Sequence, residues 1–271
     1  MTSLSEALPR GIMLLGCGKM GGAMLEGWLT QGLAASKVTV IDVAPSDRVQ
    51  ALARDAGLVV NPDAIPDADV CLLAVKPQMM EEAIGAVAGM GAGTLYVSIA
   101  AGLTIDWFQA RLGASARIVR SMPNTPAAVG KGISALVANE AAGAAGLEAA
   151  EALLAAIGAT VRLESEAQMD AVTGLSGSGP AYVFHLIEAM AAAGEAEGLA
   201  PDLAMALARA TVIGAGALAE AAEESAAQLR IDVTSPKGTT AEGLAVLMEA
   251  LPDLMRRTVG AAANRSRELA G

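Results

Sequence analysis

Aromatic side chains are scarce in this chain: two tryptophans, two tyrosines and two phenylalanines occur among 271 residues. The hydrophobic content of 54% therefore comes mainly from alanine, valine, leucine, isoleucine and methionine. Small side chains let helices approach closely, but each buries little apolar area. We therefore expect the helical part of the chain to need a partner subunit to complete its core.

Positive charge and cysteine are scarce as well. The 18 lysines and arginines face 29 aspartates and glutamates, which leaves a net charge of −11. This balance argues against nucleic acid or an anionic membrane surface as the main partner. The two cysteines, Cys17 and Cys71, show no metal-ligand spacing. A reducing, cytoplasmic setting is the simplest explanation for so few cysteines.

Two segments bear on membrane targeting. Glu6, Pro9 and Arg10 interrupt the first residues, so we expect no secretory signal peptide. The run from Ala83 to Ile105 carries no charge and is long enough to span a bilayer, but five glycines divide it. We expect a helix end, a turn, a strand and a loop there, and no transmembrane helix.

Short apolar runs alternate with helical patterns from Gly11 to about Leu163, which is typical of a doubly wound parallel sheet. Their near-continuous hydrophobicity suits strands that are buried on both faces. The expected strands are Ile12–Leu15, Val38–Ile41, Leu58–Val60, Val70–Val75, Leu95–Ile99, Ile118–Met122, Ile133–Val137 and Thr160–Leu163.

After Glu164 the strand signals end and helical patterns take over. The expected helices are Ala181–Glu197, Pro201–Ala222, Ala241–Met248 and Pro252–Glu268. The sequence therefore predicts an α/β fold with two domains: a Rossmann-type dinucleotide-binding domain at residues 1–165 and an all-helical domain at residues 166–271.

The first expected strand leads into a glycine-rich turn. Residues 16–21 read Gly-Cys-Gly-Lys-Met-Gly, which is G-x-G-x-x-G between a strand and a helical pattern. In this motif the glycines provide a tight turn, room for a pyrophosphate and close helix–strand packing. Asp42 ends the second strand, where an acidic residue can accept hydrogen bonds from an adenosine ribose. Together these features predict dinucleotide binding.

Ligands of open α/β sheets bind outside the carboxyl ends of the strands, so the loops that leave those ends matter most. Lys76 follows one strand and could meet a cofactor phosphate or ribose, or be a solvated loop lysine. The small residues of Ala100–Gly102 would let a flat nicotinamide ring lie against the backbone. Asn124 and Thr125 stand between two prolines, in a rigid polar corner that could be purely structural.

A second candidate ligand site is the loop at residues 233–240, Val-Thr-Ser-Pro-Lys-Gly-Thr-Thr. The apolar residues that follow recur at i, i+3, i+4 and i+7 and so share one helix face: Leu244, Leu247, Met248 and Leu251. The loop therefore enters a helix N-terminus, whose unpaired N–H groups and dipole favour an anion. Hydroxyls at Ser235, Thr239 and Thr240 suit a small carboxylate. The alternative is an ordinary helix cap.

Six segments, taken in order, resemble the pyrroline-5-carboxylate reductase family, and the resemblance runs from Gly11 to about Glu268. They are Gly16-Cys17-Gly18-Lys19-Met20-Gly21, Ala74-Val75-Lys76-Pro77, Ser98-Ile-Ala100-Ala101-Gly102, Met122-Pro-Asn124-Thr-Pro126, Leu175-Ser-Gly-Ser-Gly-Pro-Ala-Tyr182 and Val233-Thr-Ser235-Pro-Lys-Gly238-Thr239-Thr240. The resemblance implies NADPH- or NADH-dependent reduction of 1-pyrroline-5-carboxylate to L-proline, the last step of proline biosynthesis, without a metal.

The resemblance also implies roles for individual residues. Those implied to bind the cofactor are Gly16, Cys17, Gly18, Lys19, Met20, Gly21, Asp42, Ala74, Val75, Lys76, Pro77, Ala100, Ala101, Gly102 and Asn124. Those implied to bind the substrate are Val233, Ser235, Gly238, Thr239 and Thr240. Thr240 aligns with the family's threonine whose hydroxyl reaches the imine nitrogen, so it is the candidate catalytic residue. The family forms intertwined homodimers through its C-terminal helices, often assembled into decamers.

Three positions leave details of the resemblance open. Asp42 favours NADH, yet the family often prefers NADPH, and Ser46 or Arg48 could bind the 2′-phosphate instead. Asn61 is a candidate for the asparagine that the family uses against the adenosine. Lys237 stands where many relatives have glycine, and it could attract substrate or point to solvent.

Two other functions remain as alternatives. One is a two-domain reductase that acts on a hydroxy acid or ketone, which would need a Lys or His general acid in the helical half. Only His185 and Lys237 are available there. His185 lies outside the matched segments, and we expect a packed or interfacial helix residue. The other alternative is a regulatory nucleotide-binding module, against which the 235–240 loop argues because such a module needs no second ligand site.

Overall fold

The computed structural model describes residues 8–91 and 93–270, and the chain forms two compact units. The first unit runs to Gly177 and also includes the chain from Ala262 onward. The second unit is Ser178–Ala261. The domain boundary expected after residue 165 lies inside the first unit and stays a prediction.

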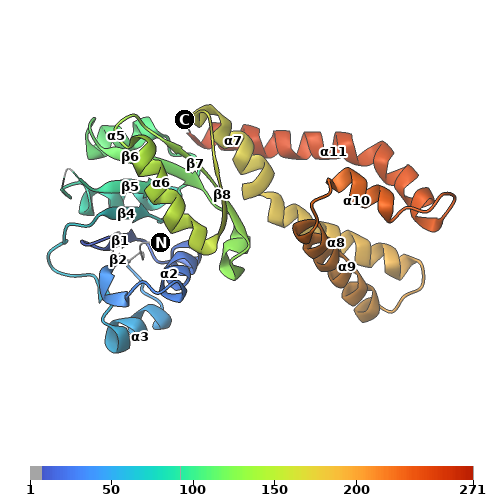
Figure 1. The fold of residues 1–271 in the computed structure, drawn as a ribbon, viewed down its shortest axis with the longest axis horizontal. Coiled ribbons are helices and arrows are strands. Elements are labelled where there is room, and N and C mark those ends of the chain that lie inside the picture. The colour runs from blue at the N-terminus through green and yellow to red at the C-terminus, as the bar shows by residue number, and fades with distance from the viewer. Residues whose placement is uncertain (1–7, 92, 271) are drawn as a thin grey trace. The chain divides into compact units, whose positions relative to one another are not determined.

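The first unit is built on an eight-stranded sheet with the order β3-β2-β1-β4-β5-β6-β7-β8 (Figure 1). The strands are β1 (Ile12–Leu15), β2 (Val38–Ile41), β3 (Val59–Val60), β4 (Val70–Leu73), β5 (Leu95–Ser98), β6 (Arg117–Met122), β7 (Gly132–Ala138) and β8 (Gly158–Arg162). All eight predicted strands are present, and their ends lie within two residues of the expected ones.

One strand pairing in this doubly wound sheet is not parallel. β7 runs antiparallel to β6, whereas the other neighbouring strands pair in parallel. Only residues 123–131 connect β6 to β7. A parallel crossover needs about a dozen residues or more, so this short connection permits only the antiparallel return.

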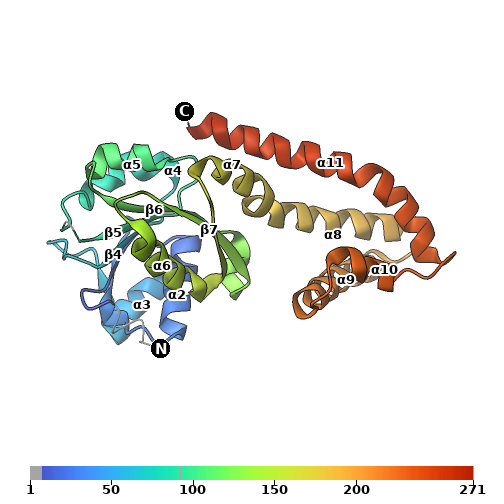
Figure 2. The same cartoon turned by 45° about the horizontal axis from the view of Figure 1, so that its top comes forward.

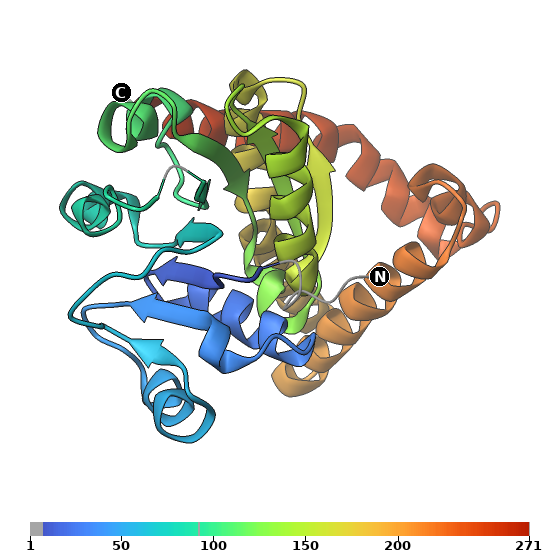
Figure 3. The same ribbon diagram turned by 60° about the vertical axis from the view of Figure 1, so that its left-hand side comes forward.

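Helices cover both faces of the sheet, as Figure 3 shows. They are α2 (Lys19–Thr30), α3 (Asp47–Ala56), α4 (Pro77–Ala83), α5 (Ile105–Leu112), α6 (Gly143–Leu154) and α7 (Met169–Val172). One apolar cluster is centred on Trp28 of α2, whose indole Nε1 donates to the carbonyl of Leu153 at 2.9 Å. The other contains Met80 of α4 and Phe108 of α5. These two clusters pack the helices against the sheet and so hold the strand ends in place.

The second unit is helical, as the sequence predicts. It contains α8 (Gly179–Ala196), α9 (Pro201–Ala221), α10 (Ala226–Asp232) and most of α11 (Thr239–Ala270). α8 and α9 lie side by side (Figure 2). The expectation of two separate helices around Pro252 is wrong, because α11 continues through this proline. A proline removes one N–H donor from a helix, and the remaining hydrogen bonds of a long helix can carry it through.

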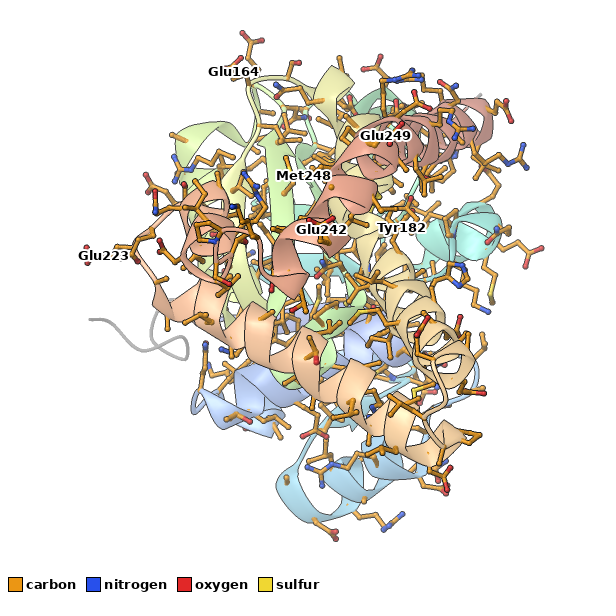
Figure 4. The ribbon with its side chains drawn as sticks, turned by 90° about the vertical axis from the view of Figure 1, so that its right-hand side faces the viewer. Glu164, Tyr182, Glu223, Glu242, Met248 and Glu249 are labelled. Carbon is orange, nitrogen blue, oxygen red and sulfur yellow. The ribbon has the colours of Figure 1, made fainter. Side chains whose placement is uncertain are left out.

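The second unit has almost no apolar core of its own. Its buried hydrophobic cluster consists of Ala191, Ala204 and Ala208. Large apolar side chains are instead exposed, among them Phe184, Leu186, Leu203, Leu207, Ile213, Leu218, Val246, Leu247, Met248, Leu251 and Leu254. Figure 4 labels Met248 of α11 together with Glu242 and Glu249 of the same helix. An apolar surface of this extent marks an interaction site.

One described helix meets the length and hydropathy criteria for a membrane span. The uncharged run at 83–105 is divided as expected: α4 ends at Ala83, a 3₁₀ turn covers Ile84–Ala86, and β5 follows. Within the described part of the chain, α9 alone is long and apolar enough to cross a membrane by length and composition. That criterion is weak evidence, because a helix in an apolar subunit interface meets it as well.

Candidate functional site

A pocket of about 380 Å³ lies at the carboxyl ends of β1, β2 and β4. The sheet order turns here, with β2 on one side of β1 and β4 on the other, which is where α/β sheets bind ligands. Predicted cofactor residues that line it are Gly16, Gly18, Asp42, Ala74, Val75 and Lys76. Lining residues that sequence reasoning missed include Val43, Met79 and Glu82. Val43 is 90% exposed, and the signal available in the sequence was its place directly after Asp42 at the end of a strand.

The glycines of the 16–21 loop each meet a distinct geometric requirement. Gly16 has φ +89°, and a Cβ there would come within 2.7 Å of the Val75 side chain. A Cβ on Gly21 would collide with the carbonyl oxygen of Gly16. At Gly18 a Cβ would meet no protein atom and would project into open space. Gly18 also caps α2 without a side-chain hydrogen bond, so the first N–H groups of this helix face an approachable space. The loop therefore fits a pyrophosphate.

Four hydrogen bonds hold Asp42 in place. Its carboxylate accepts hydrogen bonds from the backbone N–H of Cys17 at 2.6 Å and of Ala44 at 2.8 Å. Asn61 accepts from the Asp42 N–H at 3.0 Å and donates to the Asp42 carbonyl at 2.8 Å. Asn61 thus uses its side-chain amide to fix Asp42. Its proposed contact with adenosine stays a prediction.

Cys17 lies inside the glycine loop with its side chain buried. Burial, with the nearby charges of Asp42 and Glu26 adding to it, raises the pKa of this thiol to about 11. A neutral thiol is a poor nucleophile at physiological pH, so Cys17 fills space. Among the described residues, no group of three or more His, Cys, Asp or Glu side chains could hold a metal ion.

Both residues proposed to bind a 2′-phosphate make contacts within the chain. The Ser46 hydroxyl accepts from the Val49 N–H at 3.3 Å and so caps α3. Arg48 forms a two-point ion pair with Glu26 of α2, at 2.6 Å and 3.1 Å. The hydrogen bond from Arg48 holds the pKa of the Glu26 carboxyl below its ordinary value.

The other predicted cofactor residues lie along the same strand edge. Lys19 and Met20 begin α2, and Pro77 begins α4 directly after Lys76. Ala100, Ala101 and Gly102 follow β5, with Ala100 buried. Their individual contacts with a dinucleotide stay predictions.

Asn124 has a structural task. Its side-chain oxygen accepts from the Ile133 N–H at 2.9 Å, and its amide nitrogen donates to the Ser176 carbonyl at 3.1 Å. It therefore joins the start of β7 to the π-helical turn at Thr173–Gly177. These contacts give the corner a structural role, whereas a role of Asn124 in cofactor binding stays a prediction.

In the second unit, the 233–240 loop does enter a helix start. α10 ends at Asp232 with Val233 as its cap, and Thr239 and Thr240 are the first residues of α11. Their N–H groups have no acceptor within the helix, because they belong to its first turn. A Cβ on Gly238 would force the Ser235 hydroxyl to turn away and would press against the Ser235 carbonyl oxygen at 3.1 Å, so glycine lets that hydroxyl stay at the helix start.

Lys237 has φ +58°, in the left-handed region. A residue with a Cβ loses about 1–2 kcal/mol in this conformation, and glycine does not. Glycine is therefore the favourable residue here on backbone grounds alone. Lys237 is exposed, so its ammonium group lies in solvent beside the loop.

His185 lies on α8 with an 82% exposed side chain, 2.9 Å from Glu188. It is not packed within this chain, so that part of the expectation is wrong. A place at a subunit interface stays a prediction.

Comparison with known proteins decides the family. Residues 166–269 match the family model for pyrroline-5-carboxylate reductase dimerisation, and residues 11–102 match that for NADP oxidoreductase, coenzyme F420-dependent. A pyrroline-5-carboxylate reductase from Pseudomonas aeruginosa is 41% identical over 263 residues, which cover 96% of each chain. The chain belongs to the pyrroline-5-carboxylate reductase family. The resemblance found in the sequence is confirmed.

Solved structures of the family agree with this fold. A pyrroline-5-carboxylate reductase from Coxiella burnetii has 34% identity and a TM-score of 0.89, over 97% of this chain and 99% of that one. The Plasmodium falciparum pyrroline carboxylate reductase, solved with NADP bound, has 24% identity and a TM-score of 0.79, over 97% and 98%. The predicted fold class, a Rossmann-type sheet followed by a helical dimerisation domain, is confirmed. Membership of this reductase family sets aside both alternative functions.

Replacing Gly18 by alanine tests the pyrophosphate site. Because the added methyl group meets no protein atom, the free energy of unfolding should change by less than about 0.5 kcal/mol. The methyl group would occupy the ligand's space, so the dissociation constant for NADH or NADPH should rise at least about tenfold. Fluorescence titration and thermal unfolding measure both quantities. Gly21→Ala is the control and should lower stability; unchanged nucleotide binding in Gly18→Ala would place the pyrophosphate elsewhere.

Replacing Lys237 by glycine tests the backbone strain. Removing the left-handed penalty should stabilise the protein by about 0.5–1 kcal/mol, after the larger entropy of an unfolded glycine is subtracted. Lys237→Ala keeps the Cβ and removes the charge, so it should show no such gain. Unfolding midpoints of the three proteins provide the measurement, and an equal gain for alanine would mean that charge, not strain, is responsible.

Proposed function

We propose that this protein reduces 1-pyrroline-5-carboxylate to L-proline with NADPH or NADH, as the last step of proline biosynthesis. Family membership over the whole chain carries the proposal. Two anion-accepting helix starts, one in each unit, give it a chemical basis. The bound reduced nicotinamide supplies a hydride to the imine carbon.

The first unit holds the cofactor. The N–H groups at the start of α2 receive the pyrophosphate, with Gly18 leaving the space for it. Asp42 accepts from the adenosine ribose, and the apolar Val43 flanks the adenine. The small residues of Ala100–Gly102 lie against the nicotinamide.

The second unit holds the substrate. The N–H groups of Thr239 and Thr240, with the positive dipole end of α11, bind the carboxylate. The Ser235 hydroxyl lies beside them, close to Gly238. The Thr240 hydroxyl contacts the imine nitrogen. A neutral hydroxyl is a weak acid, so Thr240 orients the substrate or relays a proton to it.

The helical domain at residues 166–271 is also the dimerisation domain. The exposed apolar side chains of α9 and α11 support this role, since a second copy would bury them. The homodimer is then the building unit and a decamer its larger assembly, in the cytoplasm, without nucleic acid or a membrane as partner. The negative charge of −11 is consistent with that choice of partners.

Replacing Thr240 by alanine should lower turnover about 10- to 1,000-fold, the usual effect of losing one placed donor. NAD(P)H oxidation at 340 nm with 1-pyrroline-5-carboxylate measures it, and cofactor affinity should not change. Thr240→Ser keeps the hydroxyl and should retain most activity. Thr234→Ala removes a hydroxyl that bonds only to the Arg230 carbonyl, so it is the matched control. Wild-type protein that binds cofactor but leaves this imine unreduced would refute the assignment.

Replacing Ile213 by aspartate tests the subunit interface. Ile213 is 64% exposed on α9, and a charge there should split the homodimer if a second copy covers this surface. Sedimentation velocity measures the molecular mass. Val129→Asp, at an exposed valine of the first unit, is the control and should leave the dimer intact. An unchanged mass for Ile213→Asp would place the interface on another face.

A further inference from the structure

The geometry points to a preference for NADH over NADPH, set by the fixed carboxylate of Asp42 and by the Glu26–Arg48 ion pair. This inference rests on the proposed function only in taking a nicotinamide dinucleotide as the cofactor. The two dinucleotides differ by one phosphate on the adenosine ribose. The groups that lie at the end of β2 therefore decide between them.

Hydrogen bonds hold the Asp42 carboxylate in a fixed position where the adenosine ribose would bind. Both carboxylate oxygens accept backbone hydrogen bonds, from Cys17 and from Ala44, and Asn61 fixes the Asp42 backbone on both sides. A carboxylate has about four acceptor positions, so two remain for the hydroxyl groups of a ribose. A 2′-phosphate would instead place a second negative charge against the first, in a half-buried position where water screens the repulsion less.

The pocket offers little positive charge to offset that repulsion. Among the described residues that line it, Lys76 is the only cation, and Asp42 and Glu82 are both acidic. Lys76 follows β4, whereas Asp42 follows β2, and β1 lies between these strands. Neighbouring strands lie about 4.8 Å apart, so the two strand ends are separated by roughly 10 Å. Lys76 is therefore placed for the middle of the dinucleotide, away from the adenosine ribose.

Arg48 is the first cation after Asp42 in the sequence, and Glu26 holds it. The guanidinium Nε and Nη2 each bond to one carboxylate oxygen of Glu26, at 2.6 Å and 3.1 Å. The pair uses the Nε donor and one Nη2 donor and offsets the guanidinium charge, so a phosphate would have to bind the remaining donors against the nearby Glu26 carboxylate or displace it. The Ser46 oxygen accepts from the Val49 N–H and so caps α3; its hydroxyl proton can still donate, but a neutral hydroxyl does not offset the added charge of a phosphate.

The Glu26–Arg48 pair contributes less than Asp42 does. Its side chains are 45% and 63% exposed, and an exposed pair changes an equilibrium by no more than about fivefold. Glu26 therefore modulates a preference that Asp42 establishes.

Isothermal titration with NADH and with NADPH, in the absence of any imine, tests the inference. Wild-type protein should bind NADH at least about tenfold more tightly than NADPH. Asp42→Asn keeps the shape and removes the charge, so it should shift the ratio toward NADPH by about tenfold or more. Glu26→Gln frees Arg48 and should tighten NADPH binding by up to about fivefold with NADH affinity unchanged.

The Glu151–Arg162 pair provides a matched control. It has the same two-point geometry, at 2.8 Å and 2.6 Å, but joins α6 to β8 at the far edge of the sheet. Glu151→Gln should leave both affinities unchanged. Equal or tighter binding of NADPH by the wild type would overturn the inference, as would an equal effect of Asp42→Asn on the two cofactors. Because these titrations need no imine, they stand apart from the turnover assay that tests the proposed function.

Discussion

Two anionic ligands must be held by a chain whose own net charge is −11. Backbone N–H groups at helix N-termini meet this requirement without basic side chains, because each helix start has donors with no acceptor inside the helix. α2 provides such a start in the first unit and α11 in the second. A ligand must come close to those donors, and the backbone around each helix start permits this.

Close approach explains where glycine is indispensable. Gly16 and Gly21 let α2 begin directly against the sheet, and Gly238 lets Ser235 approach the start of α11. A Cβ would collide with backbone atoms at Gly16 and Gly21, and at Gly238 it would displace the Ser235 hydroxyl. Lys237 shows the converse case, a side chain kept at a positive φ that a glycine would adopt without strain. Lys237 is exposed, so this strained backbone places a positive charge in solvent at the 233–240 loop.

The small side chains of the second unit also affect how the chain assembles with other subunits. Alanine-rich helices approach closely but bury little area, and the second unit has three small alanines as its buried cluster. Its large apolar side chains point outward instead. The match of residues 166–269 to a dimerisation model is consistent with this surface. The proposed homodimer would supply the core that this unit lacks by itself.

The sequence by itself determined the strands, the glycine loop, the helix start after residue 238 and the family, because hydrophobic period, glycine spacing and hydroxyl clusters are local signals. Tertiary structure decided the antiparallel return of β7, the continuity of α11 through Pro252 and the addition of Val43 and Glu82 to the pocket. It also decided the partners of side chains that looked available: Asn61 on Asp42, Arg48 on Glu26, and Asn124 between β7 and the Thr173–Gly177 turn. Those pairings join residues that are far apart in the chain, and only the folded backbone sets which donor meets which acceptor.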